Sequence, residues 1–395
     1  MNQNESANPV EFSIINGGPF DQALARAGLN KPDPKSLGLR LAALIIISWL
    51  PLLILSAKAG SLLGDTVQIP FFHDFVVHTR FLIAVPLLVI AELAIAPKVR
   101  LVVRHFFTSG LIHEKDLPEF RRSIIDALRW KESYVAELVI LILVILQNTA
   151  RFDIVSSSLL SSWHDVNGSE GMELTAAGWW NMCVSIPIFQ FLFYRWLWRF
   201  FIWSNLLRRI AKLDLEIYPT HPDHSGGLSF LGEGQSKFAV IILALSSVMA
   251  AAIANHVLYG GESLVSFKFM AAMFVVLILI LFLGPLIVFT PKLIALKREG
   301  LLEYGALATS YVRSFDQKWL RDGNGQNEPL LGTGDIQSLA DLSTSVENIS
   351  NMKAFPVHLA VVKGLVVATV LPFLPLVATI IPLKDLLKQI MEILL

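Results

Sequence analysis

Charged residues are scarce in this chain of 395 residues, because Asp, Glu, Lys and Arg make up 16% of it against 54% for the hydrophobic set. A soluble domain has about 25% charged residues, so the composition excludes an ordinary soluble enzyme or binding domain. Basic and acidic residues number 32 each, and this lack of net charge argues against a nucleic-acid partner. The class that remains is a membrane protein, whose first partner is the lipid bilayer.

Cysteine and the familiar catalytic signatures are missing as well. The single cysteine, Cys183, excludes an intramolecular disulfide and every multi-cysteine metal or cluster site. The chain has no P-loop, no dinucleotide fingerprint, and no GxSxG or HExxH motif. We therefore expect no cofactor, and the sequence favours a role that is not enzymatic.

Long apolar stretches are what the chain does have. A bilayer core is crossed by roughly 20 apolar residues in a helix, with about 17 to 25 observed, and seven stretches reach that length. The predicted fold is an all-α, polytopic transmembrane helical bundle of about seven spans, with amphipathic cytoplasmic helices. The spans are expected near residues 41–57, 81–97, 134–150, 174–203, 238–258, 269–290 and 364–382.

Lys and Arg are distributed unevenly between the spans, and this asymmetry predicts the orientation. The segments before residue 41, at 98–133, at 204–237 and at 292–353 carry four, eight, four and seven of them, against one or two in each segment between. The basic segments should be cytoplasmic, starting with the polar segment 1–40. The C-terminus is then outside, where residues 383–395 form an amphipathic tail.

Two cytoplasmic segments show helical patterns. Asp116 begins a helix that is expected to continue into the third span, because a capping residue, a proline in the first turn and an early glutamate follow one another. In the segment 291–363 an aromatic stripe follows helical spacing and should pack on the bundle or the headgroup layer. It consists of Tyr304, Tyr311, Phe315 and Trp319.

Four charged residues are expected to meet inside the membrane. Glu92 and Glu137 each lie six residues from the nearest basic boundary residue, which places both about 9 Å inside the cytoplasmic surface. Arg195 and Arg199 approach the same depth and share one helix face, since they are four residues apart. An unpaired charge there costs at least ~2.5–3.5 kcal/mol, so we expect pairing, although the arginines could instead extend to the headgroups.

A second group of polar residues stands in the segment 204–237. Its His and Asp side chains could bind a metal, and its glycines could expose backbone N–H groups to an anion or headgroup. The simpler interpretation is a tight turn in which Asp223 or Ser225 caps the next helix. The residues are His221, Asp223, His224, Ser225, Gly226 and Gly227.

The run of twelve residues that begins at His221 and ends at Gly232, HPDHSGGLSFLG, resembles a signature of uncharacterised bacterial multi-pass membrane proteins. The run DIQSLADL from Asp335 to Leu342 resembles a second one. The resemblance implies a bacterial inner membrane and carries no activity.

Three classes of function stay open. Transport or conductance of a small solute or ion is favoured, because buried charge from several helices is how a polar path is built. The alternatives are a structural or regulatory scaffold whose cytoplasmic helices bind an unknown protein partner, and an enzyme that acts at headgroup level. Assembly as a homo-oligomer is compatible with each of them.

Overall fold

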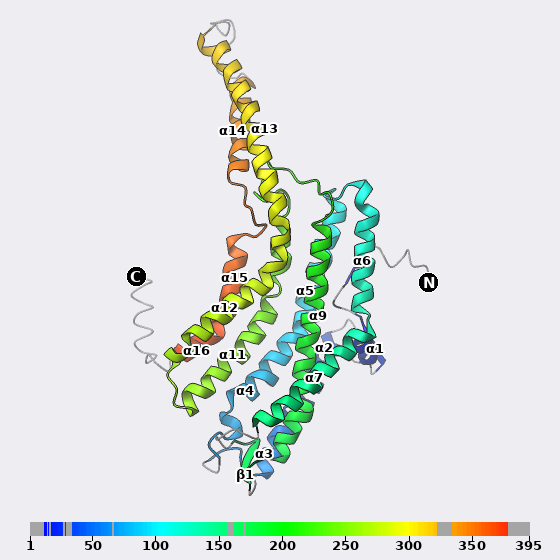
Figure 1. The fold of residues 1–395 in the computed structure, drawn as a ribbon, viewed down its shortest axis with the longest axis vertical. Coiled ribbons are helices and arrows are strands. Elements are labelled where there is room, and N and C mark those ends of the chain that lie inside the picture. Colours follow the sequence, from blue (N-terminus) through cyan, green and yellow to red (C-terminus); the bar gives the residue numbers. More distant parts are fainter. Residues whose placement is uncertain are drawn as a thin grey trace.

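A computed structural model describes residues 12–13, 15, 17–26, 28, 34–64, 67–155, 162–168, 171–321 and 334–377. It confirms the all-α, multi-pass bundle: long helices lie roughly along one axis, and a helical hairpin extends from one end (Figure 1). The described strands are one small hairpin at the opposite end, formed by β1 (Asp165–Gly168) and β2 (Gly171–Leu174).

Among the described residues, six helical runs are long and apolar enough to cross a membrane. A seventh candidate is the pair Glu114–Lys131 and Tyr134–Ala150, which is bent by 44°. The six runs are Lys35–Lys58, Phe75–Thr108, Ala176–Ile210, Phe230–Tyr259, Leu264–Arg321 and Leu359–Val377. The predicted seventh span, 364–382, ends beyond the described residues, and so does the predicted tail 383–395.

The helices are bounded as follows. The first half of the chain contains α1 (Pro19–Arg26), α2 (Pro34–Ser48), α3 (Leu50–Lys58), α4 (Phe75–His78), α5 (Val85–Thr108), α6 (Leu117–Lys131) and α7 (Tyr134–Val155). The second half contains α8 (Ala176–Trp180), α9 (Ile186–Ile210), α10 (Phe230–Ser236), α11 (Ala239–Tyr259), α12 (Lys268–Leu283), α13 (Thr290–Asp316), α14 (Gly334–Ser350), α15 (Leu359–Val370) and α16 (Leu374–Val377).

Several prolines lie where a span changes from one helix type to another, whereas Pro97 lies inside α5. A proline occupies the first turn of α3, α5 and α9, and another begins the 3₁₀ segment Gly284–Phe289 between α12 and α13. The first turn is where a missing backbone N–H has least consequence, because those N–H groups have no partner inside the helix. The spans are therefore chains of short helical pieces that continue in one direction.

The helix predicted to begin at Asp116 differs from expectation at its far end. Instead of running into the third span, α6 ends at Lys131 and α7 begins at Tyr134, with the 44° bend between them. The amphipathic α6 packs Phe120, Ile124 and Ala127 into the bundle. The bend lets α6 keep this contact while α7 presents apolar residues on all sides, as a lipid-facing helix does.

Two residues of the aromatic stripe, Tyr311 of α13 and Trp319 just beyond its end, bind α14 instead of the bundle or the headgroup layer. The Tyr311 hydroxyl donates to the Asp335 carbonyl at 3.0 Å, and the Trp319 indole donates to the Asp335 carboxylate at 3.1 Å. Lys318 also donates to this carboxylate at 2.9 Å, and the two donors hold the pKa of Asp335 below its usual value. The stripe therefore closes the α13–α14 hairpin.

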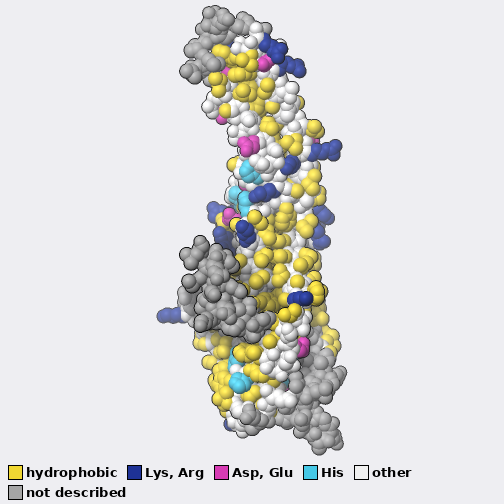
Figure 2. Space-filling model, turned by 90° about the vertical axis from the view of Figure 1, so that its left-hand side faces the viewer, with side chains coloured by type: hydrophobic (Ala, Val, Ile, Leu, Met, Phe, Trp, Pro, Cys, Tyr) yellow, Lys and Arg dark blue, Asp and Glu magenta, His cyan; other side chains and the backbone are white. Residues whose placement is uncertain are grey.

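The basic segments that follow α5, α9 and α12 lie toward the hairpin end of the molecule (Figure 1). On the face shown in Figure 2, Lys and Arg side chains gather toward the hairpin, whereas the other half of the surface is mostly hydrophobic. The short loops that were expected to be poor in Lys and Arg lie at the end of the β-hairpin (Figure 1).

Candidate functional site: a buried ion network

The structure brings the four charged residues of the predicted cluster together. Glu92 comes from α5, Glu137 from α7, and Arg195 and Arg199 from α9. Arg199 Nη1 donates to Glu92 Oε1 at 2.8 Å, and Arg195 Nε lies 3.9 Å from Glu137 Oε1. The side chains of both arginines are only 5–6% exposed, so they pair inside the protein and do not reach out to the headgroups.

Two further residues, Arg40 and Asp21, complete this ion network, and sequence reasoning missed both. Arg40 of α2 holds Glu92 with two hydrogen bonds, of 2.7 and 3.2 Å. Asp21 of α1 lies between the two arginines of α9, with Oδ1 at 3.0 Å from Arg195 Nη2 and Oδ2 at 3.3 Å from Arg199 Nη2. The ion network thus joins three arginines to three carboxylates.

Local sequence explains why the arginines of α9 tolerate this position. Their spacing of four residues directs both side chains to one face of the helix. Arg195 lies 4.7 Å from the ring centre of Phe20, and Arg199 lies 5.2 Å from that of Trp196. Aromatic faces attract guanidinium groups, which lowers the cost of taking these charges out of water.

The N-terminal segment, residues 12–26 where described, closes the ion network. The backbone N–H of Phe20 donates to Glu137 Oε1 at 3.2 Å, and that of Gly17 donates to Asp21 Oδ2 at 2.9 Å. Lys131 donates to the Ser13 carbonyl at 3.2 Å. This segment, which was expected only to be polar and cytoplasmic, is therefore partly buried against the bundle. The sequence signal that could have indicated its burial is the set of hydrophobic residues on either side of the glycines.

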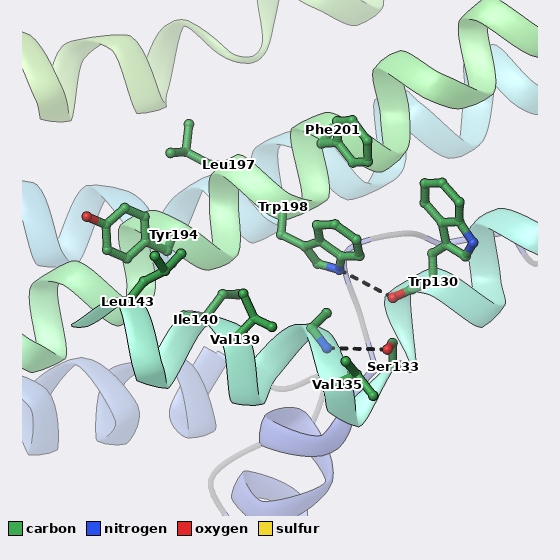
Figure 3. Close-up of a pocket in the computed structure, with 11 residues that line it drawn as sticks. Trp130, Ser133, Val135, Val139, Ile140, Leu143, Tyr194, Leu197, Trp198 and Phe201 are labelled. Atoms are coloured by element: carbon green, nitrogen blue, oxygen red, sulfur yellow. Dashed lines mark hydrogen bonds between the residues drawn. The ribbon is translucent and has the colours of Figure 1, made fainter. Parts of the chain in front are cut away.

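The larger hollows of the described structure are apolar and open to the surface. One, of about 650 Å³, lies between α7 and α9 beside the bend after α6 (Figure 3). Trp130, Trp198 and Phe201 line one end, and Leu143, Tyr194 and Leu197 lie toward the other. A second, of about 440 Å³, has a similar apolar lining. Neither is lined by a residue of the ion network.

The second predicted group forms a turn that Asp223 organises. Its carboxylate accepts hydrogen bonds from the backbone N–H groups of Ser225 at 2.8 Å, Gly227 at 3.0 Å and Ser229 at 3.0 Å. Burial raises the pKa of this carboxyl, but these three donors and His221 outweigh burial and lower the pKa to about 2. The N–H groups that an external anion would need at Gly227 and Ser225 are thus engaged by the turn itself.

The rest of the turn packs on the base of the hairpin. His224 and Gly226 adopt positive φ angles of 53° and 64°. A Cβ atom on Gly226 would lie 3.1 Å from a methyl group of Leu296. The His224 carbonyl accepts from the Lys353 backbone N–H at 2.7 Å, which ties the turn to the residues after α14.

Metal binding by the turn stays a prediction that the geometry does not favour. His221 Nδ1 lies 2.8 Å from Asp223 Oδ1, but His224 interacts with the Asn348 carbonyl, 3.4 Å from its Nδ1. Among the described residues, no group of three or more His, Cys, Asp and Glu side chains is arranged to hold a metal ion.

Comparison with known proteins adds no relative: no family model, no curated protein and no solved structure matches this chain. The resemblance to bacterial multi-pass membrane proteins stays a prediction.

Proposed function

We propose that this protein is a membrane-anchored scaffold that presents the α13–α14 hairpin to a protein partner. The observation that carries the proposal is the length of the projecting helix. The 27 residues of α13 follow directly on the last apolar residues of the span and correspond to about 40 Å of helix. Such a projection has no use inside the bilayer and is suited to contact with another protein.

Apolar side chains on the hairpin support this proposal. Leu302 and Leu320 are 69% and 74% exposed, although they lie beyond the basic residues that follow the span. Hydrophobic side chains are visible near the tip of the hairpin in Figure 2. Leu307 and Val312, which are 54% and 50% exposed, lie between these two leucines, and exposed apolar side chains along a projecting helix suit an interface with another protein.

The ion network supports a static core as well. Its three positive and three negative groups pair with one another and are mostly buried. None of these six residues lines either of the two large apolar hollows. A polar path needs charged groups that face water, whereas paired charges between helices connect α1, α2, α5, α7 and α9 to one another.

The orientation belongs to the same proposal. We place the hairpin end in the cytoplasm of a bacterial cell, because Lys and Arg concentrate there and the positive-inside rule retains such loops. The inner membrane is implied by the resemblance of the HPDHSGGLSFLG run.

The test uses a photo-crosslinking amino acid in the full-length protein in cells. Placed at Leu302 or Leu320, it should give adducts of discrete mass, whereas the exposed polar position Ser310 on the same helix serves as the matched control. Leu320→Glu should abolish the adduct formed from Leu302, because a charge at the interface opposes docking. Adducts that are absent at all three positions, or equally abundant at Ser310, would contradict the scaffold.

Transport or conductance stays a prediction with its own test. Solute or ion flux into liposomes that contain the purified protein, lost in Glu92→Gln, would favour a pathway over the scaffold. An enzyme at headgroup level would instead require the turn, and activity lost in His221→Ala would point to it.

A further inference from the structure

The Asp21 carboxylate occupies a site that resembles the binding site of an external anion. Its two oxygens meet the Nη2 atoms of Arg195 and Arg199 at 3.0 and 3.3 Å, and the three side chains are 5–6% exposed. Paired guanidinium groups are the usual protein ligands of carboxylates and phosphates, because their N–H groups match two oxygens at once. Asp21 reaches them from a separate segment, not from the helices of the bundle.

The charges of the ion network show how strongly Arg195 depends on Asp21. With Asp21 in place the three arginines face three carboxylates. Without it, Glu92 would still pair with Arg40 and Arg199, at 2.7 and 2.8 Å. Arg195 would keep only Glu137, at 3.9 Å, which is beyond hydrogen-bond distance. The bundle alone thus carries one unbalanced positive charge, centred on Arg195.

A second observation points to an anion at the same place. Arg195 Nη1 is buried and donates no hydrogen bond, although the side chain is only 6% exposed. Buried donors in folded proteins nearly always have a partner, and an unpaired guanidinium N–H is costly. Asp21 therefore does not use the full donor capacity of the site, which would suit a ligand with a third oxygen, such as a phosphate.

We propose that Arg195 and Arg199 form an oxyanion-binding site, that Asp21 fills it here as an internal ligand, and that a phosphate group competes with Asp21 for it. The phosphate can belong to an anionic lipid or be free in solution, and its chemistry at the arginines is the same. This site is independent of the scaffold proposal, because the hairpin has no residue in it.

The test compares the wild type with Asp21→Asn, both full-length and in nanodiscs of phosphatidylcholine. Inorganic phosphate should raise the thermal unfolding midpoint of Asp21→Asn by at least twice the rise in the wild type, because only the variant has a vacant site. Adding Arg195→Gln to Asp21→Asn should remove the effect. Asp126→Asn is the matched control, since it removes a carboxylate from Arg209 at 2.6 Å outside the ion network. Potassium chloride of equal ionic strength controls for screening.

The source of the phosphate is identified in the same assay. A midpoint of Asp21→Asn that rises when phosphatidylglycerol replaces part of the phosphatidylcholine, without added phosphate, assigns the site to a lipid. A rise with inorganic phosphate alone assigns it to a soluble anion. Equal rises in the wild type, Asp21→Asn and the double variant, or no rise in any of them, would overturn the proposal.

A measurement on the wild type covers the case in which Asp21→Asn does not fold. Arg26 is an exposed trypsin site at the end of α1. Competition predicts that phosphate increases the rate of cleavage after Arg26, because it displaces the N-terminal segment that carries Asp21. A rate that phosphate leaves unchanged relative to potassium chloride would overturn the proposal.

Discussion

Glu92→Gln is the sharpest single test of the ion network. The Glu92 carboxylate accepts hydrogen bonds from Arg40 at 2.7 Å and Arg199 at 2.8 Å. Glutamine keeps one acceptor oxygen but no charge. Arg199 retains Asp21, whereas Arg40, whose side chain is 6% exposed, keeps no carboxylate within 4.0 Å among the described residues. Loss of one partner from a buried ion pair costs about 3–5 kcal/mol, and we expect a destabilisation of that size.

Removal of both partners should be less harmful than removal of one. Two unit charges about 4 Å apart attract by roughly 4 kcal/mol at an effective dielectric constant near 20. This attraction is largely offset by the desolvation of the two groups, so a neutral pair loses little. We therefore expect Arg40→Met to recover part of the loss caused by Glu92→Gln, with a coupling energy of about 2–3 kcal/mol.

A double-mutant cycle in a denaturant titration of the purified protein in micelles gives this coupling energy. The matched control is the exposed pair Glu119 and Arg122 on α6, whose charged atoms lie 3.9 Å apart. Such a surface pair on one helix should couple by only about 0.2–0.5 kcal/mol. If Glu92 and Arg40 couple no more strongly than the control pair, their ion pair does not stabilise the bundle.

Three further outcomes are expected. Gly300→Ala should destabilise the protein, because the new Cβ would lie 2.7 Å from an atom of Pro219. Gly305→Ala on the same helix meets no atom within 4 Å and should stabilise the protein by about 1 kcal/mol. Chemical denaturation measures the unfolding free energy of both variants, and equal changes would mean that the loop containing Pro219 is not packed on α13. The pKa of Asp223 is lowered from 3.8 to about 2, so its contribution to stability should be complete above pH 4 and lost as the pH falls through about 2. Unfolding midpoints at these pH values should therefore fall more for the wild type than for Asp223→Asn, and parallel curves would contradict the role of its hydrogen bonds. In a cysteine-free background, a membrane-impermeant thiol reagent should label Leu63→Cys in intact cells and Ser314→Cys only after permeabilisation, and the reverse pattern would invert the proposed orientation.

The spans were predictable because the length of each apolar stretch can be compared directly with the thickness of the bilayer. The turn was predictable because its contacts are local: Asp223 accepts hydrogen bonds from N–H groups two, four and six residues further on. The bend between α6 and α7 was missed, because the residues around Glu132 contain neither proline nor glycine. The amphipathic pattern of α6 indicates which of its faces is buried, but it does not indicate the angle at which α7 continues.

The ion network shows where sequence reasoning stops. Common depth and spacing were enough to group Glu92 with the arginines of α9. Asp21 and Arg199, however, are 178 residues apart, and Asp21 lies in a helix of only eight residues outside the predicted spans. Arg40 was counted as a boundary cation, since the number of positive charges in a loop does not reveal which one turns inward. The periodicity of a sequence therefore does not predict ion pairs between segments that only the folded structure brings together.

The helical run from Leu264 to Arg321 has a mechanical consequence. Its 58 residues continue from the membrane into the hairpin, interrupted by the 3₁₀ segment that starts at Gly284. A tilt of the span by about 10° would move the end of a rigid arm of about 40 Å by roughly 7 Å. The span and the hairpin thus act as the two arms of a lever. A change in bilayer thickness or contact with a neighbouring protein would tilt the span, and the stiffness of the chain near Gly284 determines how far the tip of the hairpin then moves.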